Sequence, residues 1–246
     1  MIAINSCPVC DSNRIIPFRQ GFAPHVNYEV MPGVQVRAAI ITCYSVCQNC
    51  NVIFQNPRFS DSELKIFYSG DYYRKTINLT EEEMGRDEQY RAKADAEIIK
   101  QHVGKVIAHL DIGGSRGYLL GAVGADVRVN VEPNTSYSGV KGIEVYPEIK
   151  KVPRKTFDLV TAIHVLEHVP DPMDYLKEMI KLVDKNGHLV IEVPTWKSPG
   201  GPLRLAHLYH FEPDVLRWMC REVGLNVLET KFTPHLLLIC KLDQKI

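Results

Sequence analysis

Two pairs of cysteines have the spacing of metal-binding turns. Cys7 and Cys10 enclose Pro-Val, and Cys47 and Cys50 enclose Gln-Asn. Each CxxC turn presents two thiolates, half of a tetrahedral zinc site, and four thiolates leave no open position for water or substrate. We therefore expect a structural zinc ion. Unpaired structural cysteines are the main alternative; a redox pair is disfavoured because neither turn opens a helix in a βαβ setting.

A second group, residues 109–134, has the order expected of a nucleotide pocket. A short, mostly apolar run around Asp111 indicates a strand, Gly113 and Gly114 allow a tight turn, and residues 118–123 have the apolar content of a helix. The first N–H groups of that helix would point toward a polar ligand.

An acid stands where such a pocket needs one. Residues 127–131 alternate as a second strand, and Glu132 falls at its carboxyl end, 19 residues after Gly113. At this distance an acid can reach a ribose diol. The pattern predicts a nucleoside-containing ligand.

The sequence resembles the class I S-adenosylmethionine-dependent methyltransferases. LDIGGSRG, residues 110–117, stands where that family has LDxGxGxG, and residues 157–169 are similar to its motif FDLVxxxxVLEHV. Ser115 replaces the middle glycine, so the backbone should approach the ligand less closely or offer a hydroxyl. The resemblance implies that S-adenosylmethionine is bound by Asp111, Gly113, Gly114, Ser115, Gly117, Glu132, Ala162 and His164.

The cysteine pairs extend this resemblance. A four-cysteine zinc lobe ahead of the catalytic domain is similar to a subgroup that methylates sugars, including nucleotide-linked sugars, and in that subgroup the lobe lies beside the substrate site. The resemblance implies a zinc lobe and linker over residues 1–80 and a methyltransferase domain over residues 81–246. It favours O-methylation of a small acceptor over C- or N-methylation.

The elements that must position these motifs alternate between helix and strand. A hairpin is expected over residues 27–46, and Ser60 with Glu63 offers a capping box for a short helix. Residues 81–102 form a charged helix with a sparse apolar stripe. Residues 143–145 and 157–163 then indicate two more strands.

A further helix should begin at Asp171, with Pro172 in the first helical position, and end at Gly187 before a strand over residues 189–193. Another helix should run from Pro213 to Gly224.

Two final strands, residues 226–232 and 235–241, are joined by only two residues. A parallel crossover needs a dozen or more residues, so the last strand must run antiparallel. A reversed terminal hairpin is typical of the methyltransferase sheet. We therefore expect an α/β, Rossmann-like sheet with a reversed C-terminal hairpin, together with the small zinc lobe.

The candidate catalytic residues follow the fifth strand. His207, Tyr209 and His210 lie where the family's substrate-facing segment begins. An imidazole titrates near neutrality, so either histidine could take a proton from the acceptor. The alternative is catalysis by positioning alone, because the methyl donor is already activated.

Composition limits the partners. Lys+Arg 29 balance Asp+Glu 29, so no global field would attract nucleic acid or an anionic membrane. We find no apolar run of membrane-spanning length and no signal-peptide pattern, and expect a cytoplasmic protein with a small-molecule acceptor. The oligomeric state stays open.

Rival functions share some of these motifs. Residues 113–117 also spell GxSxG, the nucleophile elbow of serine hydrolases, with Ser115 as nucleophile. Several strands should precede such an elbow, whereas here the cysteine pairs and a helix do. The remaining alternatives are a nicotinamide dehydrogenase and a non-catalytic zinc module that binds S-adenosylmethionine.

Overall fold

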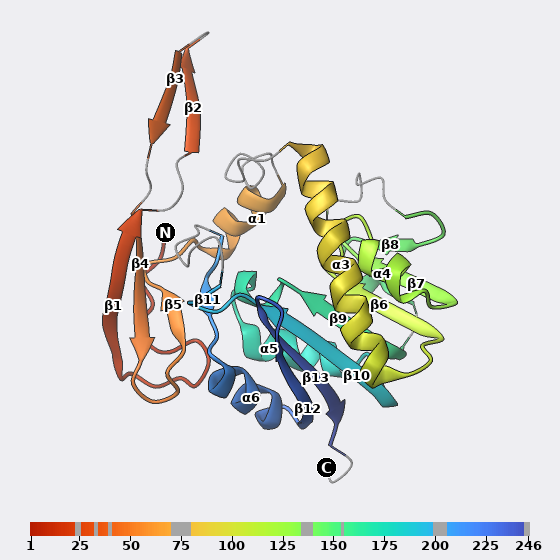
Figure 1. Cartoon of the computed structure of the whole chain (residues 1–246). Coiled ribbons are helices and arrows are strands. Elements are labelled where there is room, and N and C mark those ends of the chain that lie inside the picture. Colours follow the sequence, from red (N-terminus) through yellow and green to blue (C-terminus); the bar gives the residue numbers. More distant parts are fainter. Residues whose placement is uncertain are drawn as a thin grey trace.

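The structure is a computed structural model of the chain. It describes residues 1–22, 26–31, 34–38, 41–69, 80–133, 140–153, 155–198 and 206–243. A strand-rich lobe lies along one side of a larger α/β unit (Figure 1).

The larger unit is built on a seven-stranded sheet in the order β12-β13-β10-β9-β6-β7-β8. β13 runs antiparallel to both β10 and β12, whereas the other described strand pairs of this sheet are parallel. The reversed C-terminal hairpin and the Rossmann-like α/β class are thus confirmed. The strands are β6 (Ala108–Ile112), β7 (Val127–Val131), β8 (Glu144–Tyr146), β9 (Phe157–Ile163), β10 (Val183–Val193), β12 (Leu225–Phe232) and β13 (Leu236–Leu242).

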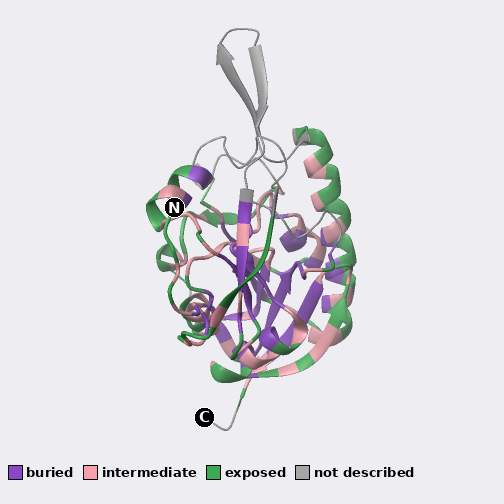
Figure 2. Cartoon of the chain, turned by 90° about the vertical axis from the view of Figure 1, so that its left-hand side faces the viewer, coloured by how far each residue is buried: buried purple, intermediate pink, exposed green. Residues whose placement is uncertain are grey.

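Helices cover both faces of this sheet. Because side chains alternate along a strand, Leu159 and Val190 pack under one helical layer while Val160 and Ile191 pack under the other. The first layer is α3 (Glu81–Val103) with α4 (Tyr118–Val123), and the second is α5 (Pro172–Ile180) with α6 (Pro213–Glu222). Figure 2 shows the buried strands enclosed between more exposed helices.

The lobe contains the expected hairpin, but it is longer than predicted. It begins at Ile15 rather than Asn27 and consists of two successive strand pairs. These are β1 (Ile15–Phe22) with β4 (Ile41–Cys47), and β2 (Val26–Met31) with β3 (Val34–Ala38). Figure 1 shows β2 and β3 extending beyond β1 and β4.

A short strand from the C-terminal half of the chain completes the lobe's sheet. The sheet order is β1-β4-β5-β11, in which β5 is Ile53–Gln55 and β11 is Tyr209–His210. The pairing of β11 with β5 is antiparallel. The predicted catalytic segment is therefore held by the lobe and not by the central sheet.

The two predicted side-chain caps, at Ser60 and Asp171, are confirmed. In the capping box before α1 (Asp61–Ser69), the Ser60 N–H donates to Glu63 at 2.8 Å and the Glu63 N–H donates to Ser60 at 3.4 Å. Before α5, the Asp171 side chain accepts from the Asp174 N–H. Short 3-10 helices occur at η1 (Ile149–Lys151) and η2 (Leu166–His168).

The boundary between α5 and β10 was also predicted wrongly. The helix expected to reach Gly187 ends at Ile180, and β10 begins at Val183, whose partner in β9 is Phe157. Gly187 lies in the irregular part of this pairing, where an added Cβ would lie 2.8 Å from the Phe157 carbonyl oxygen. Its role is to allow a close backbone approach, because a side chain has no room there.

No helix among the described residues combines the length and the apolar content that a membrane crossing requires.

Candidate functional site

The turn after β6 depends on residues with left-handed backbone. Gly113 has φ of 71°, and an added Cβ would lie 2.6 Å from the Val165 side chain. Gly117 has φ of 73°, and its Cβ would meet Ile143 at 2.5 Å. Glycine is needed at both positions for conformation and for space. Ser115 adopts φ of 46° without being glycine.

Side chains at the end of β7 anchor this turn. The Gly114 N–H donates to Asn130 Oδ1 at 3.1 Å, and the Ser115 N–H donates to Glu132 Oε2 at 3.1 Å. Asn130 Nδ2 in turn donates to the Ser115 carbonyl at 2.9 Å. The predicted ribose-binding acid thus lies against the glycine turn.

Asp111 lies beneath the turn. An added Cβ at Gly114 would lie 2.5 Å from Asp111 Oδ2, so only glycine fits above this carboxylate. Burial raises the pKa of Asp111 to about 7, although the Thr161 hydroxyl, which donates to Asp111 at 2.6 Å, opposes the rise.

Helix α3 covers the other side of the turn through Glu88. Arg116 Nη1 lies 2.9 Å from Glu88, and the Ser115 hydroxyl donates to the same carboxylate at 3.3 Å. The hydrolase alternative requires an imidazole at Ser115. Among the described residues the partner of this hydroxyl is a carboxylate instead.

Ala162 and His164 come from β9. Ala162 is buried, paired with Ile112 at the start of the turn. His164 has φ of 55°, and its ring lies 3.3 Å from Glu167 and 3.2 Å from Glu192. Burial alone would lower the pKa of His164, but these two carboxylates outweigh it and raise the pKa to about 9.

The segment after residue 206 is fixed from both sides. The Leu208 N–H donates to the Glu167 carbonyl at 2.8 Å, and the Tyr44 hydroxyl of the lobe donates to the His207 carbonyl at 3.1 Å. The ring centroids of His207 and His210 are 5.9 Å apart. These two candidates lie together.

Tyr209 differs from its two neighbours. It is buried, and its hydroxyl donates to the Pro170 carbonyl at 2.7 Å. Because side chains alternate along β11, Tyr209 and His210 point to opposite faces. His210 instead contacts Trp196 and Tyr44, with ring centroids 5.0 and 5.2 Å away.

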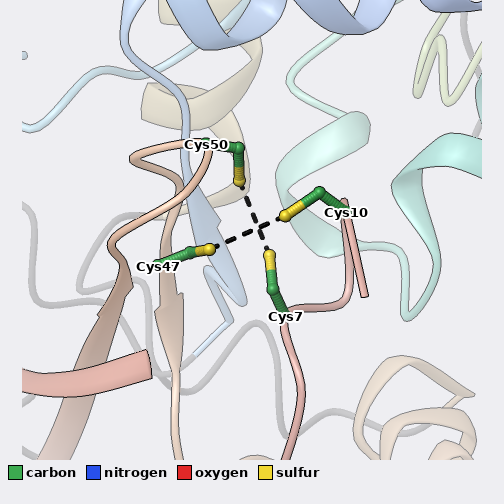
Figure 3. A group of neighbouring side chains, drawn as sticks. All are labelled: Cys7, Cys10, Cys47 and Cys50. Atoms are coloured by element: carbon green, nitrogen blue, oxygen red, sulfur yellow. Dashed lines mark hydrogen bonds between the residues drawn. The ribbon is translucent and has the colours of Figure 1, made fainter. Parts of the chain in front are cut away.

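The four predicted metal ligands converge in the lobe (Figure 3). Their sulfur atoms all lie within 4.8 Å of one another. The Cys7–Cys50 and Cys10–Cys47 sulfur distances are 3.6 and 3.7 Å. Tetrahedral zinc with bonds of about 2.3 Å separates its sulfurs by about 3.8 Å, so the residues fit the metal.

The surroundings of the sulfurs also suit a cation. Backbone N–H groups of Val9 and Asn49 donate to Cys7 and Cys47 at 3.5 and 3.4 Å. The hydrogen bond from Cys50 lowers the pKa of Cys7 to about 5. Such N–H donors stabilise thiolates, and a bound zinc ion would neutralise their charge.

Comparison with protein families identifies the larger unit. A family described as a methyltransferase domain matches residues 86–230, which is more than half of the chain. The chain belongs to this methyltransferase family. The match begins within α3 and includes the glycine turn, Glu132 and the histidine segment.

A relative of this methyltransferase is the ubiquinone biosynthesis O-methyltransferase of Neisseria meningitidis serogroup A, 33% identical over 99 residues. The aligned part spans 33% of this chain and 41% of that protein. The serogroup C enzyme of the same name is 32% identical over 99 residues, with the same coverage. The chain therefore matches less than half the length of these relatives.

Solved structures share the fold. The Burkholderia thailandensis 1,6-didemethyltoxoflavin-N1-methyltransferase, solved with S-adenosylhomocysteine, has a TM-score of 0.57 and 16% identity, covering 89% of this chain and 99% of that one. Mitomycin 7-O-methyltransferase has a TM-score of 0.56 and 16% identity, covering 73% and 60%. At these identities the likeness concerns the fold alone.

Four residues that contact the candidate site were missed in the sequence. Asn130 and Glu88 act across gaps of 15 and 28 residues, which no local pattern reveals. Glu192 offered a signal, because it is an acid within the apolar stretch of β10. Glu167 stood inside a motif that was recognised, but its burial was not foreseen.

Proposed function

We propose that this methyltransferase transfers the methyl group of S-adenosylmethionine to an oxygen of a small acceptor, a sugar or nucleotide-linked sugar. The donor would occupy the turn after β6, held by the predicted residues from Asp111 to Gly117 with Glu132, Ala162 and His164. Transfer is in line from the sulfonium, and catalysis rests on positioning together with a base.

The observation that carries the proposal is the joint placement of the glycine turn and Glu132. Gly113 and Gly114 leave no room for side chains, and the Glu132 carboxylate accepts from the Ser115 N–H. This combination suits a nucleoside whose ribose hydroxyls bind the acid while its polar tail lies near the start of α4.

The acceptor assignment is supported by an aromatic cluster between lobe and domain. Trp196, which follows β10, contacts Phe18 and Tyr44 of the lobe with ring centroids 5.2 and 5.9 Å away. The Arg19 guanidinium carbon lies 5.9 Å from the Trp196 ring centroid. Aromatic faces stack on sugars and bases, and an exposed arginine suits a diphosphate.

An acceptor screen tests this assignment. Release of S-adenosylhomocysteine should be stimulated by nucleotide-linked sugars, and Arg19→Gln should raise KM for them about tenfold through loss of a charged contact. The matched control is Arg14→Gln, another exposed arginine of the lobe, which should leave KM unchanged. If no sugar or nucleotide-linked sugar raises the rate above background, the acceptor class is wrong.

The catalytic residues are tested separately from donor binding. His210→Asn and His207→Asn should leave affinity for S-adenosylmethionine unchanged and lower turnover by about 10²- to 10⁴-fold in at least one case. Tyr209 remains a candidate only as a residue that holds this segment in place, through the hydrogen bond from its hydroxyl to the Pro170 carbonyl. A non-catalytic zinc module predicts donor binding without turnover on any acceptor. The cytoplasmic location remains a prediction.

A further inference from the structure

A second group of potential metal ligands lies in the domain, apart from the cysteines. Glu167, His168 and His207 each place one ligand atom so that the three atoms lie within 4.8 Å of one another. The backbone sets this arrangement, because the Leu208 N–H donates to the Glu167 carbonyl at 2.8 Å. The His207 strand segment thus runs directly beside the 3-10 helix η2.

The Glu167 carboxylate is fully buried and faces histidine rings instead of solvent. Oε1 lies 3.3 Å from His164 Nδ1 and 3.5 Å from His168 Nε2. Buried carboxylates are stable when they are paired with cations or coordinate metal ions.

The tautomer of His168 is set from outside the cluster. Its Nδ1 lies 2.8 Å from the Ala206 carbonyl oxygen, which can only accept, so Nδ1 carries a proton. In the neutral ring, Nε2 then directs a lone pair toward Glu167. A lone pair facing a carboxylate is unfavourable unless a proton or a metal ion lies between them. Metal-binding histidines have this arrangement, with the outer nitrogen bonded to a carbonyl.

We propose that Glu167, His168 and His207 bind a divalent first-row transition-metal ion of the Zn²⁺ type. Two imidazoles and one carboxylate suit such ions better than Mg²⁺, which prefers oxygen ligands. Three protein ligands leave at least one coordination position open. His164, between Glu167 and Glu192, acts as a positioning residue for the carboxylate.

The role of the ion rests on the proposed function, whereas the site itself does not. An acceptor hydroxyl bound at the open position would give up its proton to the base more readily. Its oxygen would then form the new bond to the methyl carbon, while the carbon–sulfur bond breaks and its electrons remain on sulfur as S-adenosylhomocysteine. His207 would then be a ligand, and His210 would remain the candidate base.

Cobalt titration of the protein loaded with a single equivalent of zinc, which the four thiolates should take first, tests the second site. We expect Co²⁺ to bind with a visible ligand-field spectrum that lacks thiolate charge-transfer absorption. Glu167→Gln and His207→Asn should weaken this binding at least about tenfold. His102→Asn removes an imidazole on α3, outside the cluster, and should leave it unchanged. Absence of thiolate-free binding, or equal affinity in all variants, would overturn the proposal.

Two further measurements keep the test decisive if a variant folds poorly. Imidazole nitrogen NMR of the wild-type protein should show two histidine Nε2 or Nδ1 resonances shifted by added Zn²⁺. Excess Mg²⁺ should not displace Co²⁺. Unshifted histidines, or displacement by Mg²⁺, would contradict the site. Since neither readout requires an acceptor, metal binding without turnover would count against the proposed function and not against the metal site.

Discussion

Ser115 shows how a single residue can depart from a family pattern without altering the turn. Its φ of 46° is a conformation that glycine adopts freely and L-residues adopt at a cost. The lost freedom is compensated locally, since its N–H donates to Glu132 and its hydroxyl donates to Glu88. The motif could be recognised in the sequence despite Ser115. The hydrogen bonds of this serine to Glu132 and Glu88 could be found only from the folded structure.

Substitutions at Ser115 should separate conformation from chemistry. Both Ser115→Ala and Ser115→Gly lose the hydrogen bond from the hydroxyl to Glu88. The alanine variant retains the conformational cost of a positive φ, whereas the glycine variant does not. We expect the glycine variant to be more stable than the alanine variant by about 1 kcal/mol in urea denaturation. Equal stabilities, or a more stable alanine variant, would contradict the left-handed assignment.

Asp111 should make stability depend on pH. Burial raises its folded-state pKa to about 7, above the ordinary 3.8, so the folded state resists ionisation. Ionisation of Asp111 therefore destabilises the folded state. This destabilisation is absent below about pH 4, grows as the pH rises and is complete above about pH 7. Relative to Asp111→Asn, the wild type should therefore lose stability between pH 5 and pH 8. Urea denaturation at both values checks this, and a constant difference would refute it.

Among the elements, β11 connects the four-cysteine lobe to the candidate catalytic segment. It is too short to be recognised in the sequence, because two residues carry no periodicity, and its partner β5 lies more than 150 residues away. The four cysteines fix the turn that precedes β5, so metal in the lobe should support the position of His210. The grouping of the four cysteines could be predicted from their spacing, but the strand pairing that connects them to His210 could not.

Loss of zinc should therefore disturb β11. We expect Cys47→Ser to lower bound zinc by elemental analysis and to increase hydrogen exchange at the amides of residues 208–210. Cys43→Ser, a cysteine of the same strand outside the cluster, should change neither. Zinc retained in the Cys47 variant, or loss of zinc without faster exchange, would argue against the connection.

At the scale of the molecule, the lobe and the domain share backbone pairs. The Gln55 N–H donates to the Leu208 carbonyl at 2.8 Å, and β11 pairs with β5. The alternation of strands and helices and the two-residue turn of the last hairpin were enough to predict the central sheet. The sharing of a strand between the two parts was not predictable, since it depends on which surfaces meet.

We therefore expect the proposed boundary at residue 80 to separate two architectures, but not two units that fold independently of each other. A fragment of residues 81–246 would leave β11 without its partner strand and expose the buried His207 to His210 segment. We expect it to unfold at a clearly lower urea concentration than the intact chain. A fragment as stable as the whole would show that the lobe contributes nothing to the domain.

The most direct test of the account is calorimetric titration of S-adenosylhomocysteine into the wild-type protein and two glutamate variants. The wild type should bind one equivalent, and Glu132→Gln should bind about tenfold or more weakly, because it lacks a charged acceptor for the ribose. Glu144→Gln, an exposed acid on the neighbouring strand β8, should bind as the wild type does. A wild-type protein that fails to bind, or a folded Glu132→Gln variant with unchanged affinity, would contradict the central claim that this turn holds the methyl donor.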